Sequence, residues 1–476
     1  MSQKAVVIGA GIGGLLAAAA LSRAAPETEV LVLDRDVLPD GPEDRRGVPQ
    51  GRHAHLLMAG GWSAMETLFE GSMRERLLEA GAREISLGSG MLALTPDAGW
   101  FHRYRWNGSR MITCTRALLD WVVRDALLAQ APDVSIHRAT VEGLIGDARR
   151  VRGVRLSGAE SVLGTQVEAD FVVDTSGRGS HNLRWLRDIG VGGVEERKVD
   201  CGLTNATRIY RTPAGAESFP LTMLQANPYN GRPGRSAMVL PIEGNRWMVS
   251  AGGTRGGEPP SDPQGFLKYI FDLPHPIVGR LIAGAEPLTD VAVSRSTSNV
   301  RRYFEKSPVW PERLLVMGDA LATFNPAYGQ GMSVAALGAR DLFRALREHG
   351  VSSPGLARRV LQDAARHVDT AWSTAVAMDV LYPGTKGGTP TLADRLATVF
   401  ARRLTQAATG SLQAAAALFD ITSLTAGPTR ALRPGALLAT LNGSPLPRLT
   451  EPPLLPSERR VLQRLTEAAA QPNATP

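Results

Sequence analysis

The 476-residue chain has only two cysteines, Cys114 and Cys201. Two thiols cannot build a disulfide framework or a cysteine metal site, and Cys114, which stands in an apolar stretch, is predicted to be a core residue. The sequence also lacks an apolar run of membrane-spanning length. Residues 5–21 come nearest, but glycines interrupt them, they fall short of about 20 residues, and Lys4 is their only basic flank. We therefore expect a cytoplasmic protein with no membrane span and no metal.

Basic residues are in excess, for a net charge of +7, but they are scattered and are mostly arginine. No Lys/Arg run with interleaved aromatic residues is present, which argues against nucleic acid as a partner. Arginine does suit the phosphates of a nucleotide cofactor. There is no internal repeat with a period of about 20 to 50 residues. The length predicts two or three domains, or one interleaved body, at about 150 residues per domain.

The first motif begins with a short apolar run, Ala5 to Ile8, which predicts a buried strand. Gly9, Gly11 and Gly14 follow with the spacing G-x-G-x-x-G, and an Ala/Leu-rich helix pattern covers about residues 11–25. In this motif the first glycine permits a tight turn, the second lets the backbone approach a pyrophosphate, and the third lets the helix lie close to the strand. A helix packed on a strand without a ligand would not need all three glycines.

A second strand is predicted over residues 29–33, and Asp34 ends it. An acid at this position can accept hydrogen bonds from an adenosine ribose, while the free N–H groups of the helix N-terminus favour phosphates. The whole unit of strand, turn, helix, strand and acid therefore predicts a dinucleotide site. The polar, Pro/Gly-rich loop over residues 37–55 comes next and carries Arg45, Arg46, His53 and His55. It either folds over the cofactor or is a solvated surface loop, and composition leaves both interpretations open.

Two later motifs also place small residues after a buried strand. Residues 171–173 deliver Asp174 to a turn of the sequence TSGRGS, and residues 314–317 lead to Gly318 and Asp319. A loop with Asn325, Pro326 and Gly329 then precedes a helix that is predicted to begin near Gly331. Each is compatible with an ordinary strand–loop–helix unit. Together, two glycine-aided helix starts about 300 residues apart indicate one extended ligand with two anionic sites.

The remaining segments are predicted more coarsely. Residues 56–82 have a helical pattern, and a strong helix begins at Arg116. Residues 184–300 are rich in strands, with a hairpin over residues 234–253 and a helical insert near residues 262–283, and we expect this sheet to form one wall of a pocket. Residues 355–441 are predicted to be helical, and the end is Pro-rich.

The three motifs, in this order, resemble the single-component FAD-dependent monooxygenases of the para-hydroxybenzoate hydroxylase type over about residues 1–345. The chain is similar, more closely, to the bacterial polyether epoxidases that act on lasalocid and monensin precursors. The stretches that carry this resemblance are RRGVPQGRHAHLL, RALLDW, VVDTSGRGS, TRGGEPP, SRST and GDALATFNPAYGQGMS.

The resemblance implies an α/β fold in which a Rossmann-like FAD-binding domain is interleaved with a β-sheet substrate domain, followed by a C-terminal helical region. We expect the discontinuous FAD-binding domain to comprise residues 1–82, 112–183 and 290–345. The substrate-binding sheet domain would comprise residues 83–111 and 184–289. The C-terminal helical region, with its Pro-rich tail, would comprise residues 346–476.

The resemblance also implies roles for single residues. The glycines of the first motif would hold the FAD pyrophosphate, Asp34 the adenosine ribose and Asp319 the ribityl chain, while Pro326, Gly329 and Gly331 would line the isoalloxazine ring. Asp174 lies in a motif that in the family contacts FAD near the docking place of the nicotinamide donor; here that motif is longer than in the aromatic hydroxylases, and Asp34 replaces the more usual glutamate. The predicted cofactor-binding residues are Gly9, Gly11, Gly13, Gly14, Asp34, Arg35, Arg46, Arg116, Asp174, Gly318, Asp319, Pro326, Gly329, Gly331 and Met332.

The activity implied is an FAD-dependent monooxygenase in which NAD(P)H reduces the flavin, O2 adds to it, and the C4a-hydroperoxide epoxidises a C=C bond of a large apolar polyketide or terpenoid. Epoxidation needs no side-chain base, so we name no catalytic residue and interpret His53 and His55 as loop-positioning groups. An alternative is a redox-neutral, flavin-containing [4+2] cyclase that keeps FAD as a structural element. A reductase of isoprenoid double bonds is a weaker alternative, and a halogenase is disfavoured because the W-x-W-x-I-P motif is absent.

Overall fold

The first motif lies at the centre of a parallel sheet. The computed structural model describes residues 3–106, 108–157, 162–295 and 297–470. The strand order is β20-β12-β1-β2-β8, and all neighbours are parallel. The strands are β1 (Gln3–Ile8), β2 (Thr28–Asp34), β8 (Val134–Arg138), β12 (Phe171–Asp174) and β20 (Leu314–Val316). Because parallel strands bring their carboxyl ends to one edge, the glycine turn and the residues that end β2, β12 and β20 meet at that edge.

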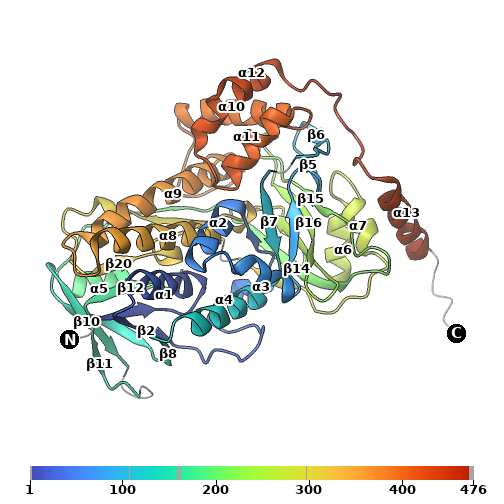
Figure 1. Ribbon diagram of the computed structural model, residues 1–476. Helices are drawn as coiled ribbons and strands as arrows, with labels where there is room; N and C mark the ends of the chain where they lie inside the picture. Colours follow the sequence, from blue (N-terminus) through green and yellow to red (C-terminus); the bar gives the residue numbers. More distant parts are fainter. Residues whose placement is uncertain (1–2, 107, 158–161, 296, 471–476) are drawn as a thin grey trace.

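Helices cover this sheet and confirm the predicted α/β class. α1 (Ile12–Ala24) follows β1 and packs against α4 (Arg116–Gln130) and α8 (Gly331–His349), and α9 (Leu356–Asp379) packs against α8 and β20 (Figure 1). The helices predicted to begin near residues 11, 116 and 331 are thereby confirmed. α5 (Asn182–Asp188) and an antiparallel sheet of β9 (Val141–Gly146), β10 (Val151–Leu156) and β11 (Gln166–Glu168) lie beside it.

A seven-stranded sheet stands next to the parallel sheet, with the order β18-β14-β17-β16-β15-β5-β6. Its strands are β5 (Met91–Thr95), β6 (Gly99–Trp100), β14 (Thr204–Arg211), β15 (Leu221–Leu224), β16 (Arg235–Ile242), β17 (Arg246–Gly253) and β18 (Ala292–Ser294). The predicted hairpin is β16 with β17. The predicted helical insert consists of α6 (Pro263–Phe271) and α7 (Ile277–Ile282), which pack with Trp247 and Val249 on one face of the sheet.

Short elements join the two large sheets. β3 (Leu56–Leu57) and β4 (Arg83–Ser86) flank β7 (Arg110–Thr113), and β19 (Asn299–Arg302) lies between β13 (Glu196–Val199) and β21 (Ala322–Thr323). The helical pattern predicted over residues 56–82 is two helices, α2 (Ala59–Leu68) and α3 (Met73–Glu79). Glu70 and Gly71 between them have positive φ angles of 56° and 80°, a conformation that cannot continue a right-handed helix. Ser296 of the SRST stretch and the last six residues lie outside the described part of the chain.

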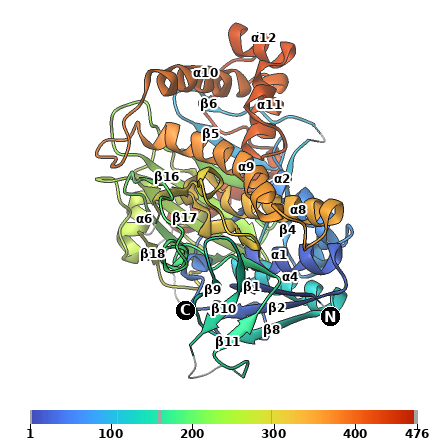
Figure 2. The same cartoon turned by 90° about the vertical axis from the view of Figure 1, so that its left-hand side faces the viewer.

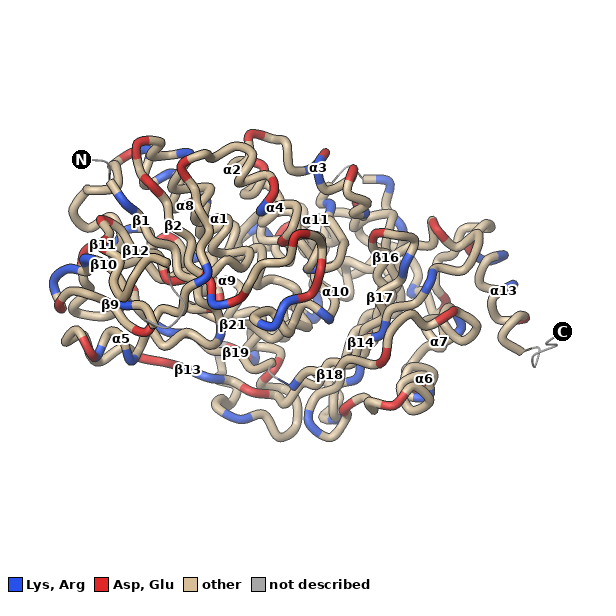
Figure 3. Tube along the Cα trace, turned by 90° about the horizontal axis from the view of Figure 1, so that it is seen from below, with Lys and Arg blue, Asp and Glu red and all other residues tan. Residues whose placement is uncertain are grey.

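The C-terminal helices divide into two places. α10 (Leu392–Ala408), α11 (Leu412–Thr422) and α12 (Pro434–Asn442) pack together beyond α9 (Figures 1 and 2). α13 (Pro456–Ala470) lies apart from them, against α7 (Figure 1). Basic and acidic residues are interspersed along the described part of the chain (Figure 3). In the part of the chain that the structure describes, every helix is too short or too polar to cross a lipid bilayer.

Candidate functional site

The three glycines of the first motif have different surroundings. Gly9 has a φ of +98°, and a Cβ on it would lie 2.8 Å from the carbonyl oxygen of Thr175. A Cβ on Gly14 would overlap the carbonyl oxygen of Gly9. A Cβ on Gly11, in contrast, would have no described atom nearer than Arg45 Nη2 at 3.7 Å and Arg116 Nη2 at 4.0 Å. Gly9 and Gly14 are thus required by the fold, while Gly11 leaves open space between two guanidinium groups.

Two helix N-termini lie at this edge of the sheet. In the described structure no side chain caps α1 at Gly11 or α8 at Gln330. The two helices are packed together near these ends, since a Cβ on Gly13 would lie 3.9 Å from the Cβ of Ala335. Backbone N–H groups at uncapped helix N-termini attract anions and hydrogen-bond acceptors. The pair agrees with the expectation of one ligand that contacts two helix starts.

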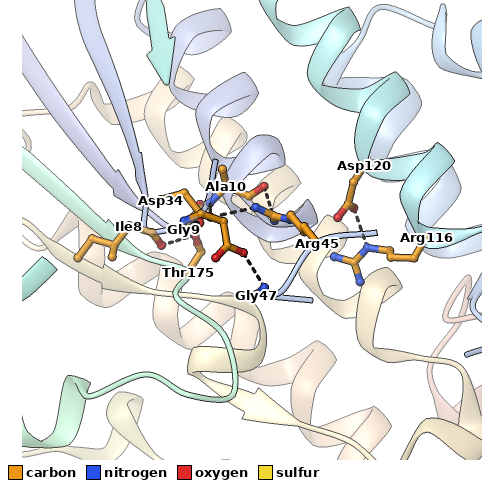
Figure 4. A network of polar contacts seen from close by, with 10 residues as sticks. Ile8, Gly9, Ala10, Asp34, Arg45, Gly47, Arg116, Asp120 and Thr175 are labelled. Carbon is orange, nitrogen blue, oxygen red and sulfur yellow. Dashed lines mark hydrogen bonds and ion pairs between the residues drawn. The ribbon is translucent and has the colours of Figure 1, made fainter. Parts of the chain in front are cut away.

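Asp34 at the end of β2 is paired with Arg45. The Asp34 carboxylate accepts hydrogen bonds from Ala10 N at 2.7 Å and from Arg45 Nη1 at 3.2 Å, and Arg45 Nη2 also donates to the Ala10 carbonyl at 2.8 Å (Figure 4). Both side chains are about nine-tenths buried, at 12% and 10% exposure. Arg35 and Arg46, which the sequence analysis named, are exposed. Arg45 and Arg46 are identical residues in neighbouring positions of the loop, so the sequence contains no signal that selects Arg45.

Arg116 is the first residue of helix α4, and its side chain points toward Arg45 and the glycine turn (Figure 4). The N-cap residue Thr115 accepts a hydrogen bond from Leu118 N at 3.2 Å, and Arg116 Nε donates to Asp120 one helical turn later at 2.6 Å. This pairing fixes the stem of the guanidinium while its Nη2 lies beside Gly11. A pocket opens between the glycine turn, the loop over residues 38–51 and α4, and its lining includes Ala10, Leu38, Arg45, Val48, Arg116 and Asp120.

Asp174 is buried and is occupied by its own loop. Its carboxylate accepts hydrogen bonds from the hydroxyls of Ser176 (2.6 Å) and Ser180 (2.7 Å) and from Asn182 Nδ2 (3.0 Å). The next residue, Thr175, donates its hydroxyl to the carbonyls of Ile8 and Gly9 at 2.8 and 3.2 Å. Asp174 therefore shapes the turn, and Thr175, which the sequence analysis did not single out, connects that turn to the glycine motif.

Asp319 of the third motif carries a carboxyl group with two cationic neighbours. Burial raises the pKa of Asp319, and the guanidinium groups of Arg178 and Arg116 oppose that rise, so both cations lie near the carboxyl group. A Cβ on Gly331 would lie 4.0 Å from Asp319 Oδ1. The charge of Arg116, whose Nη2 lies beside Gly11, thus also acts on Asp319 of the third motif. Arg178 was not among the predicted residues, although it stands in the quoted TSGRGS turn.

The loop before α8 is tightly turned. Gly318 and Gly329 have φ angles of +59° and +65°, Pro326 starts a short 3-10 turn, and Met332 is buried in the first turn of α8. Gln330 is also buried, and its Nε2 donates to the Thr422 carbonyl at 3.2 Å. Its Oε1 is buried and has no hydrogen-bond partner among the described residues. A buried acceptor of this kind is expected where a ligand or water supplies the donor.

The histidines of the loop face inward. His53 is buried, and its Nδ1 forms a hydrogen bond of 2.9 Å with the Thr207 hydroxyl, which in turn is 2.8 Å from the Ser250 hydroxyl. Desolvation by burial, and then Arg52, lower the pKa of His53. His55 Nε2 donates to the Gln50 carbonyl at 2.8 Å, and burial and the nearby Arg116 lower its pKa to about 3. These two histidines thus hold the end of the loop inward, while other loop residues, among them Glu43, Arg46 and Arg52, are exposed.

Comparison with known proteins decides the family. Residues 2–367 match the model of the family described as FAD binding domain. The chain belongs to this FAD-binding family. It is also 30% identical over 395 residues to the protein Rv3254 of Mycobacterium tuberculosis, an alignment that covers 79% of this chain and 80% of that one. The family, to which flavin-dependent monooxygenases belong, establishes a flavoprotein enzyme and confirms the predicted family resemblance. The closer similarity to polyether epoxidases stays a prediction.

Solved structures share the fold. The Diels-Alderase PyrE3 of the pyrroindomycin biosynthetic pathway matches with a TM-score of 0.58 and 18% identity, over 89% of this chain and 80% of that one. A variant of 2-methyl-3-hydroxypyridine-5-carboxylic acid oxygenase matches with a TM-score of 0.55 and 16% identity, over 94% and 99% of the two chains. The open space at Gly11, the two cations beside it and the two uncapped helix starts fit an extended, anionic cofactor such as FAD.

Proposed function

We propose that the chain is an FAD-dependent monooxygenase that epoxidises C=C bonds of a large apolar polyketide or terpenoid. In this proposal the pyrophosphate lies over Gly11 at the N-terminus of α1, with Arg45 and Arg116 as its cationic neighbours. Asp34 binds the adenosine ribose, Asp319 the ribityl chain, and the loop from Pro326 to Met332 faces the isoalloxazine ring. Reduced by NAD(P)H, bound FAD would activate O2 and supply the electrophilic oxygen atom.

The proposal of an apolar substrate is supported by one face of the seven-stranded sheet, the face that His53 contacts. Thr207 pairs across the strands with Ser250, Ser250 with Met238, and Met238 with Met223, so these four side chains form one row on one face. His53 bonds to the end of this row from the loop beside the cofactor site. The row offers hydroxyls and flexible thioethers, which adapt to a bulky apolar ligand.

The residues of this row would orient the substrate and exclude water from it. None of the four carries a carboxylate or an amine, so this wall supplies no base of the kind that an aromatic hydroxylase needs beside a phenol. Its titratable neighbour is His53, and burial favours the neutral form of that imidazole by lowering its pKa. A neutral, hydrogen-bonded wall is suited to placing an alkene, because epoxidation requires no proton transfer from a side chain.

The test is an isotope experiment on the purified flavoprotein. After the flavin spectrum has been recorded, a pathway-derived polyene is supplied with NAD(P)H under ¹⁸O2. We expect one labelled oxygen atom in the product and consumption of NAD(P)H that depends on O2. Full turnover without O2 or reductant, to a product of unchanged mass, would show that the proposal is wrong.

A redox-neutral cyclase is the second candidate, because the Diels-Alderase PyrE3 has the same fold. At 18% identity that likeness concerns the fold alone. A cyclase of this kind would use the same cofactor cradle to shape a pocket and would not need a reductant. The same incubation under nitrogen, without NAD(P)H, distinguishes it from the monooxygenase, since only a cyclase would convert the polyene to an isomer there.

A further inference from the structure

Asp379, the last residue of α9, is a buried carboxylate at the junction of three segments. It is 1% exposed. It accepts hydrogen bonds from Asn299 Nδ2 at 2.7 Å, from Asn325 Nδ2 at 2.9 Å and from Tyr328 Oη at 2.7 Å. Cys201 adjoins this cluster, since Asn325 Nδ2 lies 3.4 Å from its Sγ. One carboxylate thus lies where the segment after β13, the start of β19 and the loop before α8 come together.

The carboxylate is held by neutral donors. Burial raises the pKa of Asp379, and the hydrogen bonds from Asn325, Tyr328, Asn299 and Cys201 oppose that rise. No lysine, arginine or histidine of the described chain forms an ion pair with it, in contrast to Asp369 on the same helix, which pairs with Arg301 at 3.4 Å. Burying a carboxylate without a cation costs free energy of folding. The many hydrogen-bond donors around Asp379 offset this cost and indicate that the side chain is held in a defined position.

The segment that Asp379 holds is the loop proposed to face the isoalloxazine ring. Asn325 also donates its backbone N–H to Asn299 Oδ1 at 2.7 Å, and its own Oδ1 accepts from Ala327 N at 3.0 Å. Tyr328 is the residue before the left-handed Gly329. The turn over residues 325–329 therefore depends on Asp379 at both of its ends, through Asn325 and through Tyr328.

The segment after α9, residues 380–386, forms a strap that holds Asp379 in turn. The Thr385 hydroxyl donates to the Asp379 carbonyl at 2.7 Å. Lys386 and Asp200 exchange backbone hydrogen bonds of 2.9 Å, which join the strap to the residue before Cys201. Asp379 lies beyond residue 367, where the family match ends. The carboxylate at the centre of the cluster is therefore supplied by the part of this chain that follows the matched domain, whereas its hydrogen-bond donors lie within that domain.

We propose that Asp379 is a positioning residue for the flavin site, through which the C-terminal region sets the geometry of the loop over residues 325–331. The inference rests on the proposed placement of this loop against the isoalloxazine ring. An amide in place of the carboxylate would keep the size of the side chain. It would retain one acceptor oxygen, and its NH2 group would oppose the Asn325 and Tyr328 donors, so the turn would shift.

The experiment compares Asp379→Asn, Tyr328→Phe and the control Asp363→Asn with the wild type. Asp363 is on the same helix and pairs with Arg366 near the surface, at 3.1 Å. Each purified holoenzyme is examined for its flavin absorbance maxima and midpoint potential, and each apo-protein is titrated with FAD. For Asp379→Asn we expect a dissociation constant raised about tenfold, the effect of one lost buried hydrogen bond, together with shifted maxima and potential. Tyr328→Phe should change in the same direction by less, and Asp363→Asn should match the wild type.

The outcomes separate this inference from the proposed function. If Asp379→Asn and Tyr328→Phe lower the melting temperature but leave the FAD affinity, the spectrum and the potential at wild-type values, Asp379 is only structural and the inference is wrong. If Asp379→Asn does not fold, Tyr328→Phe decides by the same readouts. If the wild type and the Asp363→Asn control bind no FAD either, it is the proposed cofactor site that fails, and this inference fails with it.

Discussion

Gly11 and Gly14 stand three residues apart in one turn, yet the structure assigns them opposite requirements. Gly14 is in contact with the backbone of Gly9, whereas the space beside Gly11 is open. We expect Gly14→Ala to destabilise the protein by about 1 to 3 kcal/mol or more, because overpacking against backbone has no easy relief. Gly11→Ala should leave the stability of the apo-protein within about 0.5 kcal/mol and weaken FAD binding. Chemical unfolding and FAD titration measure the two effects, and a stable Gly14→Ala variant would contradict the expectation.

Arg45 and Arg46 provide a matched pair of substitutions in neighbouring positions. Arg45 is buried against Asp34 and Ala10, and Arg46 is exposed. We expect Arg45→Gln to raise the dissociation constant for FAD about tenfold, because a desolvated cation beside a phosphate contributes more than a solvated one. Arg46→Gln should change it less than about twofold. Equal effects of the two variants would show that the loop moves when the cofactor binds.

At the scale of elements, the loop over residues 45–55 connects the cofactor site to the sheet. His55 has a folded-state pKa of about 3, lowered by burial and by Arg116, while an unfolded histidine titrates near about 6.5. Between these values the unfolded chain binds one proton more than the folded chain. The stability that His55 contributes is therefore present above pH of about 6.5 and is lost as the pH falls below it.

This linkage predicts a smaller pH dependence for a His55→Gln variant. The free energy of unfolding of the wild type should fall between pH 7 and pH 5, with up to about 1.4 kcal/mol per pH unit from this one proton. The variant should lose less over the same interval. Denaturant unfolding at pH 7, 6 and 5 measures both proteins. The control is His102→Gln, in which the replaced histidine is bonded to the Pro447 carbonyl at 2.9 Å. Identical slopes for wild type and His55→Gln would refute the assignment.

For the whole molecule, helix α13 connects the C-terminal helical region to the seven-stranded sheet. Arg103 Nη2 donates to both oxygens of Glu458 at 2.9 and 2.8 Å, with exposures of 15% and 11%, and Leu462 is buried in the cluster that contains α7. Glu458→Ala should lower the free energy of unfolding by about 1 to 3 kcal/mol, because Arg103 is left without its partner. The exposed Glu467→Ala on the same helix should change it by less than about 0.5 kcal/mol. Thermal unfolding compares them, and equal melting temperatures would contradict a role for α13.

Much of the parallel sheet was predictable because its signals are local. Strand, glycine turn and helix succeed one another within residues 5–25, and a G-x-G-x-x-G turn restricts the backbone by steric contacts between near neighbours. The hairpin of β16 and β17 was predictable for the same reason. The split of residues 56–82 into two helices was missed, because a left-handed Glu70 has no signature in composition.

The side chains that complete the site were harder to identify. His53 meets Thr207 across 154 residues, and Tyr328 meets Asp379 across 51. Such contacts depend on the path of the whole chain, and no spacing rule relates the two members. The choice between Arg45 and Arg46 belongs here too, since it depends on which side of the loop turns toward Asp34.

The sequence by itself determined the nucleotide-binding edge of this protein, because each of its parts is specified by residues a few positions apart. Only the tertiary structure decided which arginine reaches that edge, that Asp174 is used within its own loop, and that α9 places a carboxylate against the turn over residues 325–329. The reason is physical. Steric limits on the backbone act between neighbours, whereas burial and hydrogen bonding are assigned only when distant segments are packed together.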